Sequence, residues 1–508
     1  PPANFDSLAY HIQRNYLFIN ENTIYPFFNA HYGNQVFQAL NSDLLFFFFA
    51  IFESNFFMNI FSIFSYLVIV VILFEILNVL NLKKDYIYTT LLMLLALSSI
   101  TLSILSTKND ILIASFGLIL IYLFYDYIKF NSKSSIVLFI ISAIYAIGIK
   151  WNFAFFLFCV FPFFIFYIFK FKKFLEFFKI SIILIPLILI IGPFEIIFFN
   201  LSHELGPIGP YDHVEGHTNP NGIIGLFSNL IRVTFSMFDI TFPIHYFGFN
   251  FVNEYFNYSV NSLLQYLFDN TKLGISEQIK WLEYDYGYNL RPHSDYTGYS
   301  LVGFIISVLS FHYLLFGKNN ILKVLSFLSF LNIIVLSYYL TWQPWILRYF
   351  MISMLINLII STEYIKNIDI KNLKIINLFC LSIILFNVLT NVSQPLIKHS
   401  KTPSWLLAFT DREKYQSYSI PEMKKIKNFI KTVSPGKKVI IIVNREGSQT
   451  PYEILRTSKN NYFVFADKNL NRYIQKVYLK YELKIDAFKY DYILNISEEN
   501  LQFENFSF

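Results

Sequence analysis

Long apolar segments, separated by short polar turns, run through most of the chain. A helix needs about 20 mostly apolar residues to cross the hydrocarbon core of a bilayer. The segments close to that length are residues 56–80, 86–105, 111–130, 134–150, 152–170, 178–199, 301–317, 321–340, 345–365 and 373–393. The pattern predicts an all-α polytopic membrane protein, a helical bundle with about ten spans.

A shorter apolar segment lies near the start of the chain, in residues 33–52. Its uninterrupted part, Leu44–Phe52, is too short to cross a membrane, and Asp43 interrupts the segment just before it. Such a helix can lie flat in the interface between headgroups and acyl chains. We therefore expect an interfacial helix on the outer leaflet. If it crossed the membrane instead, the sidedness of every later span would invert.

The last part of the chain, residues 394–508, has a different character. Lys and Glu become frequent, and short β-rich runs alternate with helical stretches such as 421–432. The β-rich runs are residues 438–443, 462–466 and 490–494. This alternation is typical of a parallel sheet covered by helices, so we expect a small C-terminal α/β domain. The sequence contains no glycine-rich phosphate loop, and nucleotide binding therefore has no support.

Composition supports the membrane assignment. Hydrophobic residues make up 55% of the 508 positions and charged residues 15%, whereas a soluble domain is about 25% charged. Mean hydropathy is +0.47. The two cysteines lie inside apolar runs, which excludes a disulfide scaffold. The net charge of +6 is no sign of nucleic-acid binding, because the basic residues lie at the ends of the apolar segments.

Lys and Arg are distributed unequally between alternate connections. Thirteen lie in one set, namely Lys83, Lys84, Lys129, Lys133, Lys170, Lys172, Lys173, Lys179, Lys318, Lys323, Lys366, Lys371 and Lys374. The other set of short turns holds Lys108, Lys150 and Arg348. Because cytoplasmic loops carry the excess of positive charge, the first set is predicted to be cytoplasmic.

This sidedness predicts the organisation of the whole chain. We expect an outer segment in residues 1–55, six spans in 56–199, a large outer loop in 200–300, four spans in 301–393 and an outer domain in 394–508. The sequence begins at Pro1 without Met. Since an outer segment must be carried across the membrane, we expect a first transmembrane helix before it.

The outer segment carries a cluster of polar side chains. On a helix, Asp6, Tyr10 and Arg14 share one face at i, i+4 spacing, and His11 borders that face. A carboxylate beside an arginine stays ionised and can accept a proton from a hydroxyl group, as a general base does. The alternative is an ordinary ion pair on a solvated amphipathic helix.

Three further charged residues lie at the predicted outer ends of spans. Asp110 begins a span, where it could also act only as a helix cap. Lys150 follows a short span, and Arg348 lies about one turn inside another. A cation at headgroup depth needs a partner such as a lipid phosphate, so Lys150 and Arg348 are candidate phosphate ligands.

The large outer loop holds candidate substrate-binding residues. His203, Glu204, Asp212, His213, Glu215 and His217 crowd together in a way that resembles a metal site. Intervening Gly and Pro prevent a regular helix, which favours a polar loop that lines the substrate site, with His217 as one contact. His293 and Asp295 stand among aromatic residues just before the next span. Carboxylates and aromatic rings bind sugars, although interfacial aromatics would look the same.

The order of these motifs resembles a known group. Asp6-Ser-Leu-Ala-Tyr-His-Ile-Gln-Arg14, Lys108-Asn-Asp110, Gly148-Ile-Lys150, His293-Ser-Asp-Tyr-Thr-Gly298 and Gln343-Pro-Trp-Ile-Leu-Arg348 follow one another along the chain. They are similar to motifs of bacterial integral membrane glycosyltransferases of the GT-C superfamily. These enzymes are relatives of the protein O-mannosyltransferases and of the lipid A aminoarabinose transferase. The resemblance extends over the whole chain.

The resemblance implies an inverting glycosyltransferase in the bacterial plasma membrane, with its active site at the outer face. The donor would be a polyprenyl-phosphate-linked sugar, and the acceptor a glycan, lipid or protein hydroxyl. Asp6 would be the base, and Asp110 would be the second acidic catalytic residue, which positions the acceptor or the base. Lys150, Arg348 and Arg14 would bind the donor phosphate, and Tyr10, His11, His217, His293 and Asp295 the substrate.

Two features depart from the family pattern. Ser7 follows Asp6 where the mannosyltransferases have a second acid, and Ser294 stands where relatives often carry one. The sequence therefore indicates no definite cofactor and leaves a divalent metal as an alternative. A transporter or flippase of lipid-linked saccharides is the competing function, although it would favour charges in the middle of spans. We expect Asp6, Asp110, Lys150, Asp295 and Arg348 to converge on one cavity.

Overall fold

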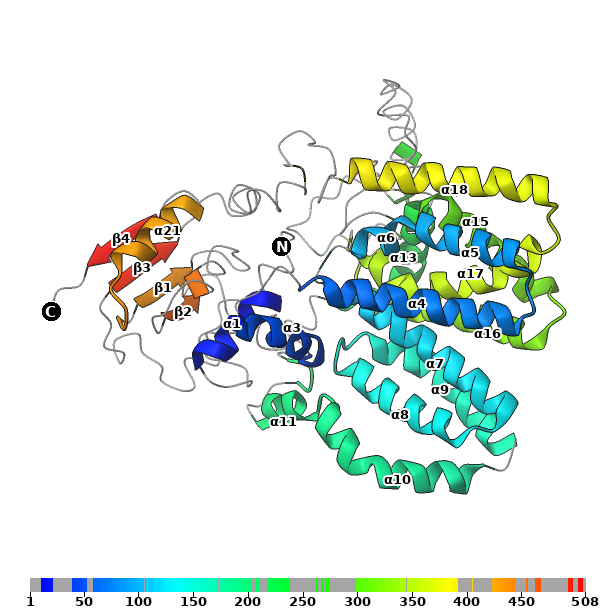
Figure 1. Ribbon diagram of the computed structural model, residues 1–508, viewed down its shortest axis with the longest axis horizontal. Coiled ribbons are helices and arrows are strands. Elements are labelled where there is room, and N and C mark those ends of the chain that lie inside the picture. The colour runs from blue at the N-terminus through cyan, green and yellow to red at the C-terminus, as the bar shows by residue number, and fades with distance from the viewer. Residues whose placement is uncertain are drawn as a thin grey trace.

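The computed structural model is a bundle of helices with a small sheet at one end (Figure 1). The residues that it describes are 11–21, 39–52, 58–104, 106, 108–170, 173–202, 206–209, 217–237, 262–263, 266–268, 270–271, 273, 298–343, 345–391, 404, 423–437, 439–443, 454–455, 462–466, 492–496 and 501–505. All statements below concern these residues.

The first half of the bundle follows the predicted apolar segments. Its helices are α4 (Ile60–Val79), α5 (Lys84–Ala96), α6 (Ser98–Ser103), α7 (Asp110–Phe130), α8 (Lys133–Ile147), α9 (Phe153–Lys170), α10 (Phe174–Ile191) and α11 (Phe194–Ser202). The predicted span 86–105 is divided at Leu97, where the backbone is extended. The predicted span 178–199 ends early, because the extended Gly192 and the following Pro193 separate α10 from α11.

The second half of the bundle surrounds one central helix. The elements are α13 (Gly222–Met237), α15 (Ser300–Phe316), α16 (Asn320–Tyr339), the 3-10 helix η4 (Ile346–Phe350), α17 (Met351–Ile365) and α18 (Ile370–Thr390). Nearly every side chain of α17 is buried, whereas α10 buries none. Thus α17 is the centre of the main apolar core, and α10 lies at the edge of the bundle (Figure 1).

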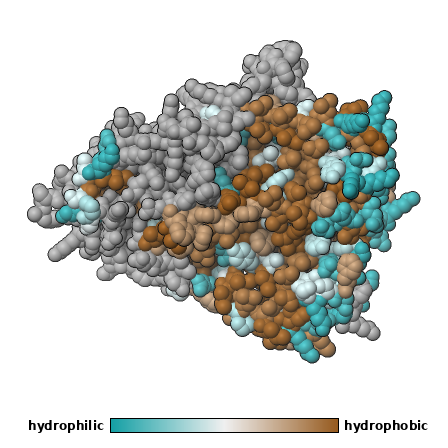
Figure 2. Space-filling model, in the orientation of Figure 1, coloured by the Kyte–Doolittle hydropathy of each residue, from teal (hydrophilic) through white to brown (hydrophobic). Residues whose placement is uncertain are grey.

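Helices occupy all ten predicted places, and seven of them are long and apolar enough to cross a membrane. The seven are α4, α7, α9, α10, α16, η4 with α17, and α18. A multi-pass membrane protein is therefore supported, while the segments 86–105, 134–150 and 301–317 form shorter helices and stay predictions as spans. Figure 2 shows the matching surface, with apolar side chains over the helical body and hydrophilic ones along one edge.

The Lys-rich connections lie together at one end of the bundle. The turns between α4 and α5, α7 and α8, α15 and α16, and α17 and α18 are all at this end (Figure 1). The turns that carry Asp110, Lys150 and Arg348 therefore lie at the opposite ends of their helices. Which of the two ends faces the cytoplasm stays a prediction.

A network of uncharged polar side chains joins α15, α16 and α17 inside the bundle. Asn357 Nδ2 donates to Ser307 Oγ at 3.2 Å, and Asn357 Oδ1 accepts from Ser329 Oγ at 2.7 Å. Asn332 Nδ2 donates to Ser353 Oγ at 2.9 Å. In a bilayer the hydrophobic effect does not drive helices together, because the lipid tails are apolar as well. Hydrogen bonds of this kind help to hold the helices to one another there.

Replacing Asn357 with leucine should weaken this network. The side chain is fully buried, and two interhelical hydrogen bonds are lost. We expect the free energy of unfolding to fall by about 1–2 kcal/mol, since each such bond contributes up to about 1.7 kcal/mol. Unfolding in mixed detergent micelles measures the change. Asn78→Leu, at an exposed position in α4, is the control and should change stability by less than about 0.5 kcal/mol.

The N-terminal residues form a second group of helices, α1 (Ile12–Glu21) and α3 (Asn41–Ile51). With 11 residues, α3 is too short to cross a membrane. Its exposed side chains include Phe48 and Ile51. Asp43, which interrupts the apolar run in the sequence, lies in the first turn of α3, and its side chain is buried.

The C-terminal residues form a four-stranded sheet with the order β2-β1-β3-β4. Its strands are β1 (Val439–Val443), β2 (Tyr462–Ala466), β3 (Tyr492–Ile496) and β4 (Leu501–Asn505), preceded by helix α21 (Met423–Thr432). β1 pairs in parallel with β2 and β3, and β4 is antiparallel to β3. Three strands overlap the predicted β-rich runs, and β4 was not expected. That this part is a separate outer domain stays a prediction.

Candidate active site

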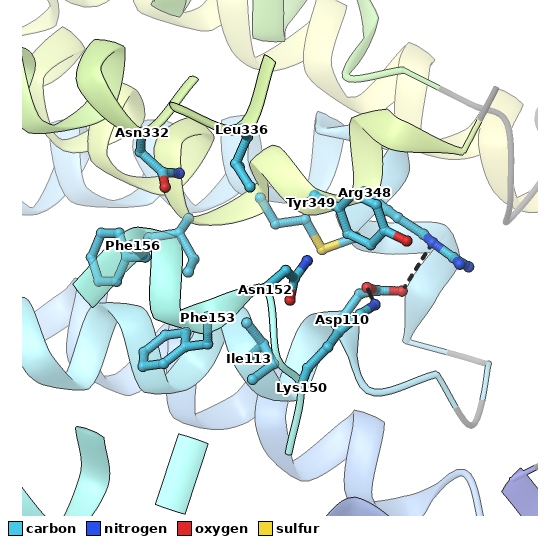
Figure 3. A pocket seen from close by; sticks show the side chains of 12 residues that line it. Asp110, Ile113, Lys150, Asn152, Phe153, Phe156, Asn332, Leu336, Arg348 and Tyr349 are labelled. Atoms are coloured by element: carbon cyan, nitrogen blue, oxygen red, sulfur yellow. Dashed lines mark hydrogen bonds and ion pairs between the residues drawn. The ribbon is translucent and has the colours of Figure 1, made fainter. Parts of the chain in front are cut away.

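Three charged side chains from separate helix ends meet at one point (Figure 3). Asp110 is the first residue of α7, and its carboxylate accepts a hydrogen bond from Lys150 Nζ in the turn after α8. Arg348 Nε, in η4, lies 3.5 Å from the other carboxylate oxygen of Asp110. These three members of the predicted site are therefore brought together.

Local backbone contacts determine where each member lies. The turn at 148–150 follows α8 closely, because the Lys150 amide donates to Ala146 O at 3.2 Å. Asn109 Nδ2 donates to Ile149 O at 3.1 Å and thereby joins this turn to the start of α7. The hydroxyl of Tyr299 donates to Leu347 O at 2.5 Å, which holds η4 beside them. Arg348 is thus in a 3-10 turn before α17 and not inside a long helix.

Positive charge exceeds negative charge among the described residues at this point. Lys108 is buried two positions before Asp110, and its charge acts on the same carboxylate. The Tyr349 ring lies 4.6 Å from Lys150 Nζ and 5.6 Å from Arg348 Cζ. Cations over an aromatic face are stabilised by the ring. The arrangement attracts an anion, as clusters of cations in a low-dielectric cleft do.

A narrow pocket extends from the three charged residues into the bundle (Figure 3). Its lining comes from several helices and comprises Asp110, Ile113, Lys150, Asn152, Phe153, Phe156, Asn332, Leu336, Arg348, Tyr349, Met351 and Ile352. The open space inside is about 10 Å³, which is room for about one water molecule. The side-chain oxygens of Asn152 and Asn332 are buried here and accept no hydrogen bond from the described residues. They are acceptors for a ligand hydroxyl or a water.

Two other predicted residues form a separate buried cluster. His11 Nδ1 lies 2.7 Å from Asp43 Oδ1, and Arg14 Nη1 donates to Asp43 Oδ2 at 2.8 Å. All three side chains are buried, and Arg14 also donates to Ala39 O at 3.3 Å. Arg14 is not among the residues that contact Asp110 or line the pocket. Its predicted phosphate-binding role gains no support from this position.

His217 lies beside the Gln343 motif. Its Nδ1 is 2.9 Å from Gln343 Nε2, and its carbonyl accepts from the Thr341 amide at 3.1 Å. His217 is an exposed residue. Its partner Gln343 lies five positions before Arg348 in the sequence. The His217 side chain therefore borders the segment that leads to Arg348, without lining the pocket.

Asp6, Tyr10, His293 and Asp295 lie outside the described residues. The end of the 293–298 motif is described, and Gly298 O accepts from the Ser99 amide at 3.0 Å. Since Tyr299 contacts Leu347, the motif ends next to η4. Among the described residues, no group of His, Cys, Asp or Glu could hold a metal ion.

Four residues that shape these clusters are not among the predicted site residues. Asp43 lay in the sequence as a single carboxylate before an apolar run, which is itself a sign of a buried partner. Lys108 lies in the motif Lys108-Asn-Asp110, where the sequence pattern indicates no role for it. Asn152 and Asn332 gave no signal, because an amide in a polar turn or in a span is common.

No protein-family model, characterised protein or solved structure matches this chain. The geometry of the site and the motifs in the sequence are therefore the basis for a function.

Proposed function

We propose that the protein is an inverting glycosyltransferase of the GT-C type. It would take a sugar from a polyprenyl-phosphate donor and transfer it to a hydroxyl group of a glycan, lipid or protein. The observation that carries this proposal is the meeting of Lys150 and Arg348 on Asp110, at the ends of membrane-length helices. A donor with a lipid tail and a phosphate would place its charge at this depth.

The charged residues have distinct roles in this reaction. Lys150 and Arg348 bind the phosphate, and Asp110 orients both cations before the donor arrives. The amide oxygens of Asn152 and Asn332 accept hydrogen bonds from sugar hydroxyls near the phosphate. The pocket has to widen for a whole sugar ring, and release of Lys150 from Asp110 to the phosphate would open its mouth.

The proposed step is a single displacement. Asp6 accepts the proton of the acceptor hydroxyl, and the acceptor oxygen forms a bond to the anomeric carbon. The bond from that carbon to the phosphate oxygen breaks, and the polyprenyl phosphate leaves with the electron pair. Because the oxygen attacks opposite the leaving group, the anomeric configuration inverts. A phosphate paired with two cations is a good leaving group, so no protein acid is needed.

The sidedness, the C-terminal domain and the partners are proposed from the sequence. The site would face the outer side of a bacterial plasma membrane, together with residues 200–300 and a C-terminal α/β domain in 394–508. Membrane lipid surrounds the bundle, and no nucleic acid is bound. The sheet with α21 supplies the core of such a domain.

Reconstitution into liposomes tests the function. The protein is given polyprenyl phosphates that carry labelled glucose, mannose, galactose or arabinose, with a membrane extract as the source of acceptors. Transfer of label, with a product linkage of the opposite anomeric configuration, supports the proposal. Movement of the donor between leaflets without transfer would indicate the competing flippase.

Arg348→Ala is expected to weaken donor binding. A charge-assisted hydrogen bond contributes about 1.5 kcal/mol or more, so the dissociation constant for undecaprenyl phosphate should rise about tenfold. Thermal shift in detergent measures it. Lys366→Ala is the control, because it removes an equal charge at the Lys-rich end, where Lys366 pairs with Glu363. Equal affinities in the wild type and Arg348→Ala would contradict the assigned role.

A further inference from the structure

The turn that carries Lys150 is held from two sides. On one side, Asn109 Nδ2 bonds Ile149 O, and on the other, the backbone amide of Asn41 in α3 donates to Gly148 O at 2.8 Å. A side chain at position 148 is excluded, because a Cβ there would lie 2.2 Å from Asn41 Nδ2. The close approach therefore requires glycine at this position.

The side chain of Asn41 also joins two helices. Its Nδ2 donates to Tyr145 O, in the last turn of α8, at 3.0 Å, and to Ile191 O, the last residue of α10, at 2.8 Å. The last carbonyls of a helix have no partner within it. One amide thus satisfies a carbonyl at each of two helix ends, and with the backbone bond it attaches α3 to both.

Asn41 is two positions from Asp43, which binds α1. Asp43 binds Arg14 in α1 and His11 directly before it, and Asn15 Nδ2 in α1 donates to His11 O at 2.7 Å. Asn41 and Asp43 therefore link α1 to the Lys150 turn through buried hydrogen bonds. In the sequence, α1 directly follows the segment that contains Asp6.

We propose that Asn41 is a positioning residue that fixes α3 and α1 relative to the Lys150 turn. It keeps α1 at one distance from the cations at Asp110. The functional part of this inference rests on the proposed function, in which the N-terminal segment supplies the base and Lys150 binds the phosphate. Small misplacements of reacting groups cost large factors in rate.

Distances between spin labels test the attachment itself. Cysteines replace Phe48 in α3 and Leu138 in α8, which are exposed, while the native Cys159 and Cys380 are buried. We expect a narrow distance distribution in the wild type and a broadened one in Asn41→Leu. Asn41→Asp keeps the size and removes the donor, and Gly148→Ala displaces Asn41, so both should broaden it too. Asn78→Leu is the matched control and should leave it narrow. An unchanged distribution in Asn41→Leu would overturn the proposal.

Steady-state transfer kinetics test the consequence. Because Asn109 and Asp110 still hold Lys150, Asn41→Leu should leave the KM for the donor within about twofold. We expect kcat per folded molecule to fall about 10-fold or more, since misplacement of about 1 Å costs up to about 100-fold. A residue that only stabilises the fold would reduce the yield and leave kcat unchanged, which would overturn the positioning role. If the wild type transfers no sugar, the proposed function fails, and the spin-label distances alone decide on the attachment.

Discussion

Asp110→Asn is expected to destabilise the protein by about 3 kcal/mol, the lower end of the range for breaking a buried ion pair. The Asp110 side chain is 3% exposed, and its carboxylate forms ion pairs with both Lys150 and Arg348. Asparagine keeps the shape and removes the charge, which leaves two cations facing each other. The side chains of Lys150 and Arg348 are 14% and 10% exposed, so water relieves part of the cost. Unfolding in mixed micelles measures the loss.

A second substitution distinguishes this electrostatic cause from a loss of packing. Lys150→Met in the Asp110→Asn background removes one of the two facing cations, so stability should return part of the way. Asp85→Asn, at an exposed position in α5, should change stability by less than about 0.5 kcal/mol. If the double variant were as unstable as Asp110→Asn, repulsion between Lys150 and Arg348 would not be the cause.

Asp6→Asn is expected to lower kcat by roughly 10²–10⁴-fold, the contribution of a general base. The substitution keeps the size of the side chain and removes the proton acceptor, while Lys150 and Arg348 are untouched. Donor binding should therefore stay within about twofold of the wild type. Single-turnover transfer with excess protein measures the chemical step, and thermal shift with undecaprenyl phosphate measures binding.

The matched control for Asp6→Asn is Asp369→Asn, near the Lys-rich end. Asp369 Oδ1 accepts from the Asn372 amide at the start of α18, so a local effect on the helix cap is expected and no effect on transfer. Transfer by Asp6→Asn at the wild-type rate would assign the base to another residue. Loss of both transfer and donor binding would show that Asp6 holds the site together and does not act as the base.

The positions of the helices could be predicted because apolar length is a local property of the sequence. The division at Leu97 could not, since no proline or glycine marks it. The break at Gly192-Pro193 does carry a local signal, because proline cannot continue a helix through its own position without losing a hydrogen bond. The strands β1, β2 and β3 were visible as β-rich runs, whereas β4 mixes polar and apolar residues in five positions.

The site was partly predictable for a different reason. Asp110, Lys150 and Arg348 lie in alternate connections. An even number of predicted spans separates these connections, which places them at the same end of a bundle. The number of spans does not determine which side chains meet across the bundle. The pairing of Asp43 with Arg14, the contact of Asn41 with two helix ends and the amide oxygens of the pocket depend on packing between distant segments. No periodicity in the sequence encodes these contacts.

The bond from Asn41 to Ile191 O joins residues 150 positions apart, and this separation has a consequence for biosynthesis. A ribosome adds about 5–20 residues per second, so roughly 8–30 s pass between the synthesis of Asn41 and that of Ile191. During that interval the N-terminal helices lack their final docking surface. Conditions that slow translation between these residues should therefore expose nascent chains to proteolysis for longer, and they would lower the yield of the protein without changing the stability of finished molecules.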